Sequence, residues 1–427
     1  MGESELTVLT TWEGMPIQMP EGSDGRAIAA RVMRISESIP FPAFRMNKGR
    51  LCAAEAVGTI QVAGVRINVL PKTDSSEKAR DSDFLVNILR AAGYLCRAHT
   101  SSGAVRSSVR DPLEVMITEA AAELNFVLKD GVPRLYKEKH EDSRTLRGRI
   151  DFARLATRLP SDLTVLPVRH TPLTVQNDLA HCLLWLATTL ARLTRSSFNR
   201  QLLTTLIGRL SAVGNGGHKL PVPAFAKLRL APSEAHCERV LSLAKLLSQG
   251  QFVDPTFAGN TDGFTMLFPL QHLFERALRK VLAETLSDCG ITIKNSGQPL
   301  FLLRGNDDGD NVLRLKPDYL LYRENRLIAV ADAKWKRFNE TTRAYGARRE
   351  DFYQVNAYLD TFAVNNSVVL MPRAPWMPSS WVRSYTVTHS GRKVHLVGVD
   401  IENLVSHRAE VKTAARDALR DALLAIV

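Results

Sequence analysis

The segment that decides the fold is Leu315-Lys-Pro-Asp-Tyr-Leu-Leu-Tyr-Arg-Glu-Asn-Arg-Leu-Ile-Ala-Val-Ala-Asp-Ala-Lys-Trp335. Two runs with strand character flank a polar turn centred near Glu324-Asn325, which predicts an antiparallel hairpin. Folding the chain about that turn sets Asp318 opposite Ala331 or Asp332. Asp332 and Lys334 are two residues apart, so their side chains point to one face of the strand. The sequence therefore predicts two carboxylates and an ammonium group together at the end of a sheet.

Such a group of charges favours a metal site over a plain ion pair. Adjacent carboxylates repel each other, and Mg²⁺ binds a few carboxylate oxygens while it keeps waters in its other positions. We therefore expect Asp318 and Asp332 to hold Mg²⁺, which polarises a phosphoryl oxygen and acidifies a bound water. Lys334 would orient that water or offset charge in the transition state. The alternative is a surface ion pair between Asp332 and Lys334, worth under about 1 kcal/mol.

The flanking segments add candidate residues for the same site. An amphipathic helix is expected at 268–286, with Glu275 beside its apolar face. A second helix, expected at about 350–362, carries Gln354 and Tyr358 one turn apart on one face. The segment between the second strand of the hairpin and this second helix contains four arginines: Arg337, Arg343, Arg348 and Arg349.

Further strand patterns complete an α/β domain that we expect to span residues 256–427. The hydrophobic pattern predicts seven strands, which include the two of the hairpin, and a C-terminal helix near 408–426. The expected strands lie at 291–294, 300–303, 312–322, 327–335, 367–371, 385–388 and 393–399.

The first 255 residues divide into two parts. Residues 1–96 read as a β-rich domain with a hairpin at 57–62 and 65–70 and a helix from 84 to 95. After a linker expected at 97–110, residues 97–255 read as a mainly helical region. Its predicted helices follow Asp111-Pro112 and lie near 177–194 and 199–213. A charged segment within it carries three arginines: Arg144, Arg147 and Arg149.

Composition excludes several classes of protein. The chain has 427 residues with 45% hydrophobic residues, so it is neither disordered nor collagenous. Its 56 basic and 44 acidic residues give a net charge of +12, which is compatible with a polyanionic partner. The five cysteines form no C-x-x-C pair, which argues against a zinc ribbon. No long apolar run and no signal peptide are visible, so we expect a cytoplasmic protein.

These motifs together resemble a known family. Pro317-Asp318, Asp332-Ala-Lys334, Tyr353-Gln-x-x-x-Tyr358 and Leu273-Phe-Glu275 look like the PD-(D/E)xK nuclease superfamily. The Lys-Trp pair, the first hairpin through Lys72 and the motif Leu146-Arg-Gly-Arg-Ile-Asp151 look most like the McrC family. McrC is the nuclease subunit of the McrBC modification-dependent restriction system. A loop at 305–310 before the metal strand departs from a compact member.

The resemblance implies a multidomain α/β protein: a β-rich N-terminal domain, a helical middle region and a PD-(D/E)xK restriction-endonuclease-like α/β domain. It implies an Mg²⁺-dependent DNA endonuclease in which Asp318, Asp332, Lys334, Glu275 and Gln354 are catalytic. It also implies an McrB-like AAA+ GTPase hexamer as the partner, which recognises modified double-stranded DNA, docks on residues 97–255 and is stimulated by this subunit. Arg144, Arg147 and Arg149 are then candidate contacts to the partner's nucleotide site. The four arginines Arg337, Arg343, Arg348 and Arg349 are candidates for DNA-backbone contacts. Dimerisation through the nuclease subunit is a further implication. The sequence contains no Gly-Lys dipeptide, so a Walker A loop is absent.

Two alternatives remain open. The chain could be a non-catalytic adaptor that activates an NTPase, although the complete set of acidic and lysine positions argues against a decayed site. It could also be a stand-alone RecB-like repair nuclease. The long N-terminal half, which exceeds the nuclease domain in length, argues against that interpretation.

Overall fold

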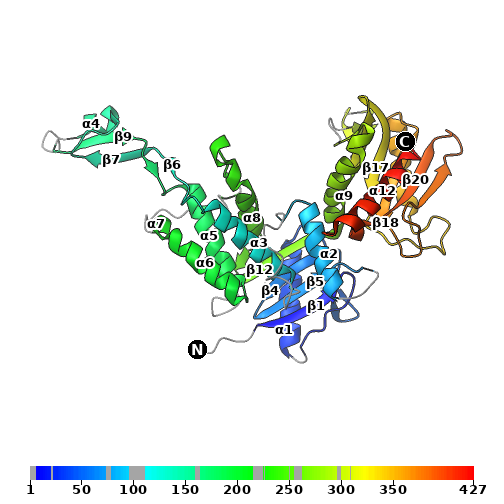
Figure 1. Ribbon diagram of the computed structural model, residues 1–427, viewed down its shortest axis with the longest axis horizontal. Coiled ribbons are helices and arrows are strands. Elements are labelled where there is room, and N and C mark those ends of the chain that lie inside the picture. The colour runs from blue at the N-terminus through cyan, green and yellow to red at the C-terminus, as the bar shows by residue number, and fades with distance from the viewer. Residues whose placement is uncertain are drawn as a thin grey trace. The chain divides into compact units, whose positions relative to one another are not determined.

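Figure 1 shows the computed structural model of the chain, which falls into two compact units. The first unit contains residues 1–97, 108–113 and 252–427, and the second contains 98–107 and 114–251. The expected linker at 97–110 and residues 1–5 lie outside the residues that the structure describes. Those described residues are 6–20, 23–73, 78–95, 111–158, 164–214, 225, 227–249, 251–253, 262–295, 300–307 and 309–427.

A five-stranded sheet in the order β1-β5-β4-β12-β11 forms one part of the first unit. The predicted hairpin is confirmed: β4 (Ala56–Val62) and β5 (Val65–Leu70) are antiparallel, and β1 (Thr7–Trp12) runs parallel to β5. Helix α1 (Ser23–Ser38) packs on this sheet through an apolar cluster of buried side chains. The remaining elements of this part are β2 (Phe44–Asn47), β3 (Arg50–Ala53), β11 (Gln251–Val253) and α2 (Lys78–Ala91).

The fourth strand of this sheet, β12, changes where the C-terminal domain begins and where the helix expected at 268–286 begins. Strand β12 (Asp262–Pro269) pairs antiparallel with β4, so the chain after residue 256 returns to the N-terminal sheet before the C-terminal domain begins. The expected helix at 268–286 begins only at Leu270, as α9 (Leu270–Leu286). Phe264, Met266 and Phe268 are buried at every second position, which is the period of a strand. Helix α2 likewise covers 78–91 rather than 84–95.

The second part of the first unit is a six-stranded sheet in the order β13-β16-β17-β18-β20-β19. Its first three strands are antiparallel, whereas β17, β18 and β20 are parallel. Helices α9 and α12 lie side by side against this sheet, and α10 packs on β17 and β18 (Figure 1). The bounds are β13 (Ile291–Lys294), β16 (Tyr319–Arg323), β17 (Arg326–Ala333), α10 (Arg349–Thr361), β18 (Asn366–Pro372), β19 (Val382–Thr386), β20 (Lys393–Val399), α11 (Ile401–Leu404) and α12 (Ala409–Leu424).

The single strand expected at 312–322 is wrong. It splits into β15 (Asn311–Leu315), which pairs with β14 (Leu300–Arg304) in a separate hairpin, and β16. The break falls at Pro317, because proline has no N–H to continue a ladder. The edge strand expected at 385–388 is displaced and lies at Val382–Thr386.

The second unit combines helices with small antiparallel sheets. The predicted helices are present as α3 (Pro112–Val127), α5 (Asp178–Leu193) and α6 (Ser197–Arg209), and Asn177 caps α5 by accepting a bond from the Ala180 N–H. A three-stranded sheet in the order β7-β9-β8 was not expected. Strand β7 (Lys139–Ser143) is polar and carries no apolar period, and β9 buries two adjacent residues, Pro167 and Val168. The other bounds are β6 (Leu135–Tyr136), β7 (Lys139–Ser143), β8 (Arg149–Ile150), α4 (Phe152–Ala156), β9 (Leu166–His170), β10 (Leu173–Thr174), α7 (Ser211–Gly214) and α8 (Glu238–Gln249).

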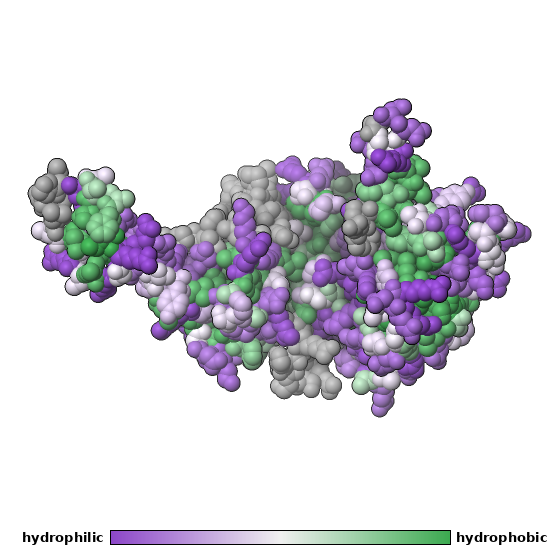
Figure 2. Space-filling view, turned by 90° about the horizontal axis from the view of Figure 1, so that it is seen from above, coloured by the Kyte–Doolittle hydropathy of each residue, from purple (hydrophilic) through white to green (hydrophobic). Residues whose placement is uncertain are grey.

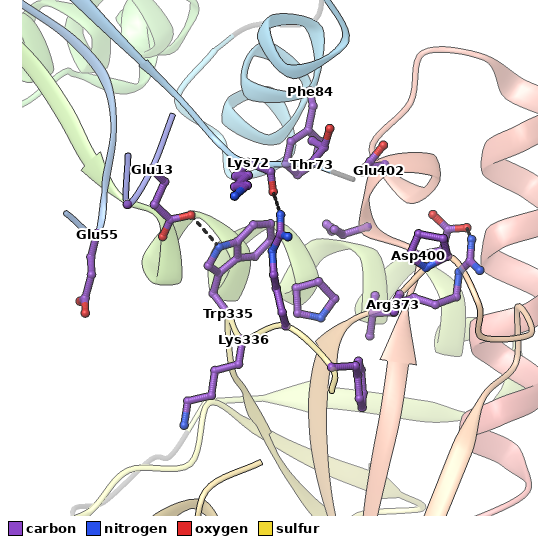
Figure 3. A pocket seen from close by; sticks show the side chains of 18 of the residues that line it. Glu13, Glu55, Lys72, Thr73, Phe84, Trp335, Lys336, Arg373, Asp400 and Glu402 are labelled. Carbon is purple, nitrogen blue, oxygen red and sulfur yellow. Dashed lines mark hydrogen bonds and ion pairs between the residues drawn. The ribbon is translucent and has the colours of Figure 1, made fainter. Parts of the chain in front are cut away.

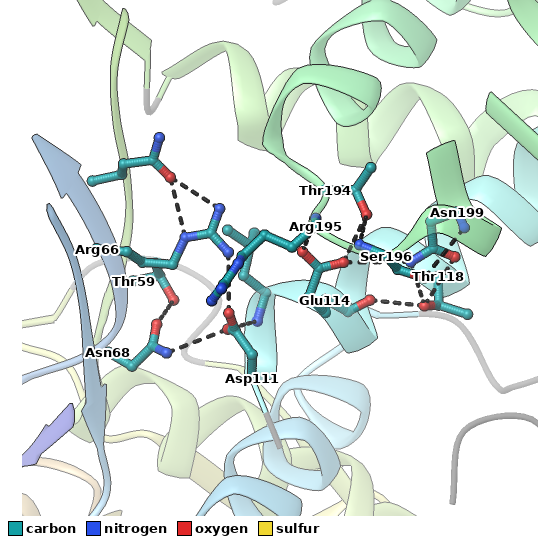
Figure 4. Close-up of polar contacts among 12 residues, drawn as sticks. Thr59, Arg66, Asn68, Asp111, Glu114, Thr118, Thr194, Arg195, Ser196 and Asn199 are labelled. Atoms are coloured by element: carbon teal, nitrogen blue, oxygen red, sulfur yellow. Dashed lines mark hydrogen bonds and ion pairs between the residues drawn. The ribbon is translucent and has the colours of Figure 1, made fainter. Parts of the chain in front are cut away.

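Each unit contains a buried polar network (Figure 4). In the first unit, Arg66 is 1% exposed and donates to Asp111 at 3.0 Å and to Gln61. In the second unit, the Glu114 carboxylate accepts bonds from the Thr194 hydroxyl at 2.7 Å and from the Arg195 N–H. Buried charges are costly unless they are paired and hydrogen-bonded, so both networks hold their segments in one arrangement.

In the described part of the chain, we find no helix of the length and apolar character that a bilayer crossing demands.

Candidate active site

The β16–β17 hairpin brings the two predicted carboxylates together. Glu324 and Asn325 form its turn with φ of 49° and 62°, and Tyr319 pairs with Ala331. Continuing this register places Asp318 beside Asp332, as predicted. The Ala333 N–H donates to Asp318 Oδ2 at 2.8 Å, which fixes the first carboxylate against the second strand.

Lys334 and helix α10 complete a polar cluster around Asp332. The Lys334 ammonium lies 2.7 Å from Asp332 Oδ2 and donates to Gln354 Oε1 at 3.0 Å. Gln354 in turn donates to the Tyr358 hydroxyl at 2.7 Å, and that hydroxyl lies 3.4 Å from Asp332 Oδ1. Gln354 and Tyr358 therefore lie on one face of the helix, as predicted, and both contact the cluster. Asp332 is 2% exposed, so the surrounding protein covers this side chain almost completely.

Glu275 reaches the same site from α9. Its charge acts on both Asp318 and Asp332. Gln271, one turn earlier, donates to Glu275 Oε1 at 2.8 Å and to the Ala333 carbonyl at 2.6 Å. Its own oxygen accepts from the Trp335 N–H at 2.7 Å. Gln271 was missed from the sequence, although its spacing of four residues from Glu275 on an amphipathic helix was a usable signal.

Two other missed residues hold the Asp318 end of the site. Arg279 donates to the Asp318 carbonyl at 3.1 Å, and its guanidinium lies 5.5 Å from the centre of the Tyr319 ring. The fully buried Tyr319 donates its hydroxyl to the Glu275 carbonyl at 2.7 Å. Side chains alternate between the faces of a strand. Tyr319 therefore contacts α9, whereas Asp332 contacts α10.

Burial and mutual repulsion change the acidity of these groups. Burial, followed by the charges of Asp332 and Glu275, raises the pKa of Asp318 to about 7. Burial also raises the pKa of Asp332, although the Lys334 ammonium opposes this. Burial by itself lowers the pKa of Lys334, but the Asp332 carboxylate outweighs it and raises the pKa overall. The site therefore holds more negative charge than the single ammonium neutralises once both aspartates are ionised.

This donor set fits a divalent cation. Among the described residues, no group of three or more His, Cys, Asp or Glu side chains is arranged to hold a metal. Mg²⁺ needs fewer, because it is usually bound by one or two carboxylates together with waters and phosphate oxygens. Asp318 and Asp332 offer two carboxylates whose repulsion a cation would relieve. We find the residues compatible with Mg²⁺ on these grounds.

The four arginines after the strand are exposed, but they are not equivalent. Arg348 and Arg349 lie at the N-terminus of α10, and the Arg348 N–H is bonded to Asp351. Arg337 donates to the Lys72 carbonyl at 3.1 Å, and Arg343 accepts a bond from Tyr385 through its carbonyl. Their side chains are accessible to a phosphate backbone.

Arg144, Arg147 and Arg149 lie in the second unit, on and between β7 and β8, and all three are exposed. Gly148 between them has φ of 70°, and a Cβ there would lie 2.4 Å from the Arg169 carbonyl oxygen, so only glycine fits. Leu146 and Phe152 beside them are 62% and 71% exposed. Figure 2 shows apolar side chains gathered on the surface of this sheet among polar ones. Exposed apolar groups next to cations are typical of a protein interaction site.

The fold and this site define a multidomain α/β protein with an acid–lysine cluster at the end of a sheet. A family model described as "McrBC 5-methylcytosine restriction system component" matches residues 51–371. The chain belongs to this family, which confirms the McrC resemblance of its motifs. A comparison with curated proteins finds no significant match.

Two solved structures share the fold. One is a chain of the "Refined half-complex from tetradecameric assembly of Thermococcus gammatolerans McrB AAA+ hexamers with bound McrC". The similarity covers 99% of our chain and 100% of that chain, with a TM-score of 0.70 and 18% identity. The other is a chain of the Thermococcus gammatolerans McrBC complex solved by cryo-electron microscopy. It covers 66% and 88% of the two chains, with a TM-score of 0.51 and 20% identity.

Proposed function

We propose that this protein is the Mg²⁺-dependent endonuclease subunit of an McrBC-type restriction system. The observation that carries the proposal is the Asp318–Asp332–Lys334 cluster, with its 2.7 Å ion pair and its raised carboxylate pKa values. Perturbed acids that converge with a cation at a strand end are typical of catalytic sites. Membership of a family described as a 5-methylcytosine restriction system component supports our proposal that the substrate is double-stranded DNA.

In this proposal, each side chain has a distinct part. Asp318 and Asp332 would hold Mg²⁺, which supplies Lewis acidity for a phosphoryl oxygen and makes a water more acidic. Lys334 offsets the charge that develops on the phosphoryl oxygens. Gln354 and Tyr358 hold the ammonium and the Asp332 carboxylate in place through their hydrogen bonds. Glu275 adds negative charge beside both aspartates and so favours the bound cation.

The proposal includes a GTPase partner. The related structures are named as McrB AAA+ hexamers with bound McrC and as an McrBC complex, and we propose the same kind of partner for this protein. Reading of the modified base would then fall to the partner. Arg144, Arg147 and Arg149, on an exposed sheet with apolar neighbours, are the candidate contacts to its nucleotide site.

The test is Asp332→Ala, assayed with the partner GTPase, GTP, Mg²⁺ and modified DNA. We expect DNA cleavage to fall by about a hundredfold or more, because the metal loses a ligand and Lys334 its partner. Stimulation of GTP hydrolysis should remain. Asp417→Asn, which changes a half-exposed aspartate on α12, is the control and should keep both activities. Continued Mg²⁺-dependent cleavage by Asp332→Ala would end the active-site assignment.

A further inference from the structure

A large cavity opens beside the residue that follows Lys334 (Figure 3). Its volume is about 890 Å³, and all its lining residues belong to the first unit. Trp335, Lys336 and Arg337 form one wall, and the ends of β1 and β5 supply another through Glu13 and Lys72. A volume of this size falls within the range of roughly 300–1,000 Å³ that is typical of ligand sites. Of the residues discussed above as site or DNA-backbone candidates, only Arg337 lines this cavity; the acid–lysine cluster does not.

The position of Trp335 in this wall is fixed. Its indole N–H donates to Glu13 Oε2 at 3.1 Å (Figure 3), and its ring stacks on Phe84 with centres 6.3 Å apart. Phe274 packs edge-on against the same ring at 5.4 Å. A side chain held from three sides gives a ligand a rigid surface at low entropic cost. The wall is therefore pre-organised next to the catalytic lysine.

The cavity carries excess positive charge. Arg373 pairs with Asp400, and Arg80 pairs with Glu402, each at 2.8 Å, so these four side chains neutralise one another. In contrast, Arg45 and Lys72 have no carboxylate within ion-pair distance among the residues that the structure describes. Both line the cavity. The carboxylates of Glu13 and Glu55 also line the cavity, so Arg45 and Lys72 act together with Arg337 against two negative charges when an anion enters it.

An exposed aromatic ring lies on the same lining. Trp376 is 44% exposed, and Tyr345 supports it at 6.4 Å between ring centres. Flat rings and unpaired cations in one cavity are the two features that recognise single-stranded nucleic acid, through base stacking and phosphate contacts. A duplex cannot enter a concave cavity of this size, whereas a frayed or extruded nucleotide can.

We propose that this cavity, the strand pocket, binds about one nucleotide of single-stranded DNA next to the cleavage point. Arg45 and Lys72 contact its phosphates and Trp376 stacks on its base. The inference deepens the proposed nuclease function, on which it rests, by stating what the strand does after it leaves the duplex. The pocket then holds the strand against the wall that begins at Trp335, one residue along the chain from Lys334, and keeps it in place during cleavage.

The experiment measures binding of a fluorescein-labelled oligo(dT) to the full chain by anisotropy at several salt concentrations. In the double variant Arg45→Ala/Lys72→Ala, the slope of log K against log salt should fall by about 1.4, which corresponds to two lost single-strand phosphate contacts. Trp376→Ala should weaken binding about tenfold, as expected for one lost stacking contact. The controls are Arg326→Ala, at the opposite end of β17 from the site, and Phe198→Ala, an exposed ring of the second unit.

Several outcomes overturn the inference. Unchanged salt slope and affinity in the pocket variants would remove the strand pocket as a DNA site, as would equal losses in the two controls. Loss of GTPase stimulation with intact oligonucleotide binding would assign the surface to the protein partner instead. The proposed function is tested separately: if the wild-type protein with its partner does not cleave DNA, the nuclease proposal fails whatever the pocket binds.

Discussion

At the scale of single residues, the acidity of Asp318 has a consequence for stability. Its pKa is about 7 in the folded protein, against about 3.9 in an unfolded chain. The folded state therefore binds this proton more tightly, and the stabilisation it gives is lost as pH rises through 7. The cause is burial beside Asp332 and Glu275, so a neutral side chain at position 318 removes the effect.

We therefore predict that, without divalent ions, Tm falls less between pH 5 and pH 8 for Asp318→Asn than for the wild type. Differential scanning fluorimetry across this range measures the difference. Asp417→Asn is the control and should follow the wild-type curve. Equal curves of Tm against pH for the wild type and Asp318→Asn would show that burial and the neighbouring carboxylates do not raise the pKa of Asp318. Mg²⁺ should restore the wild type most at pH 8, where both aspartates are ionised.

At the scale of elements, the pairing of β4 with β12 requires glycine at position 58. Gly58 has φ of 125°, and a Cβ there would lie 2.1 Å from the Met266 carbonyl oxygen. Gly58→Ala should therefore reduce the free energy of unfolding by more than about 2 kcal/mol. Gly64→Ala is the matched control, because that turn glycine has φ of 75° but open space around it.

Gly64→Ala should reduce the free energy of unfolding by about 1 kcal/mol, because only the backbone conformation is unfavourable there. Denaturant unfolding of both variants checks the difference. If the two variants lose equal stability, the close approach of β12 to β4 is not a constraint on this sheet.

The elements also show where local patterns predict well and where they fail. The hairpins at β4–β5 and β16–β17 were predictable, because alternating residues and a two-residue turn specify register locally. Strand β12 was not, since Leu267 and Phe268 fit the apolar face of a helix as well as a buried strand. Its partner β4 lies some 200 residues earlier, and no local pattern encodes that pairing. The β7-β9-β8 sheet was missed because β7 is a run of polar residues and β8 spans only two residues, so neither shows an alternating apolar pattern.

At the scale of the whole molecule, the two units are expected to carry separable functions. The triple variant Arg144→Ala/Arg147→Ala/Arg149→Ala should lower stimulation of the partner GTPase by about tenfold or more, because an arginine at a nucleotide site stabilises transition-state charge. Binding of oligonucleotide to the first unit should be unchanged. Arg209→Ala, an exposed arginine in the last turn of α6, is the control. GTP hydrolysis at saturating subunit measures the effect.

Normal stimulation by the triple variant would remove these arginines from the partner interface. It would leave the acid–lysine site untouched, since that site depends only on residues of the first unit.

The sequence by itself determined the β-hairpin of β16 and β17, the spacing of Asp318, Asp332 and Lys334, and the helix face that carries Gln354 and Tyr358. Short-range periodicity sets which residues share a face, so these features need no knowledge of the rest of the chain. Only the tertiary structure decided the partners that come from distant segments: Gln271 and Tyr319 at the site, β12 in the first sheet, and Glu13 on Trp335. Those contacts depend on how separate elements pack, and burial in that packing is also what raises the carboxylate pKa values.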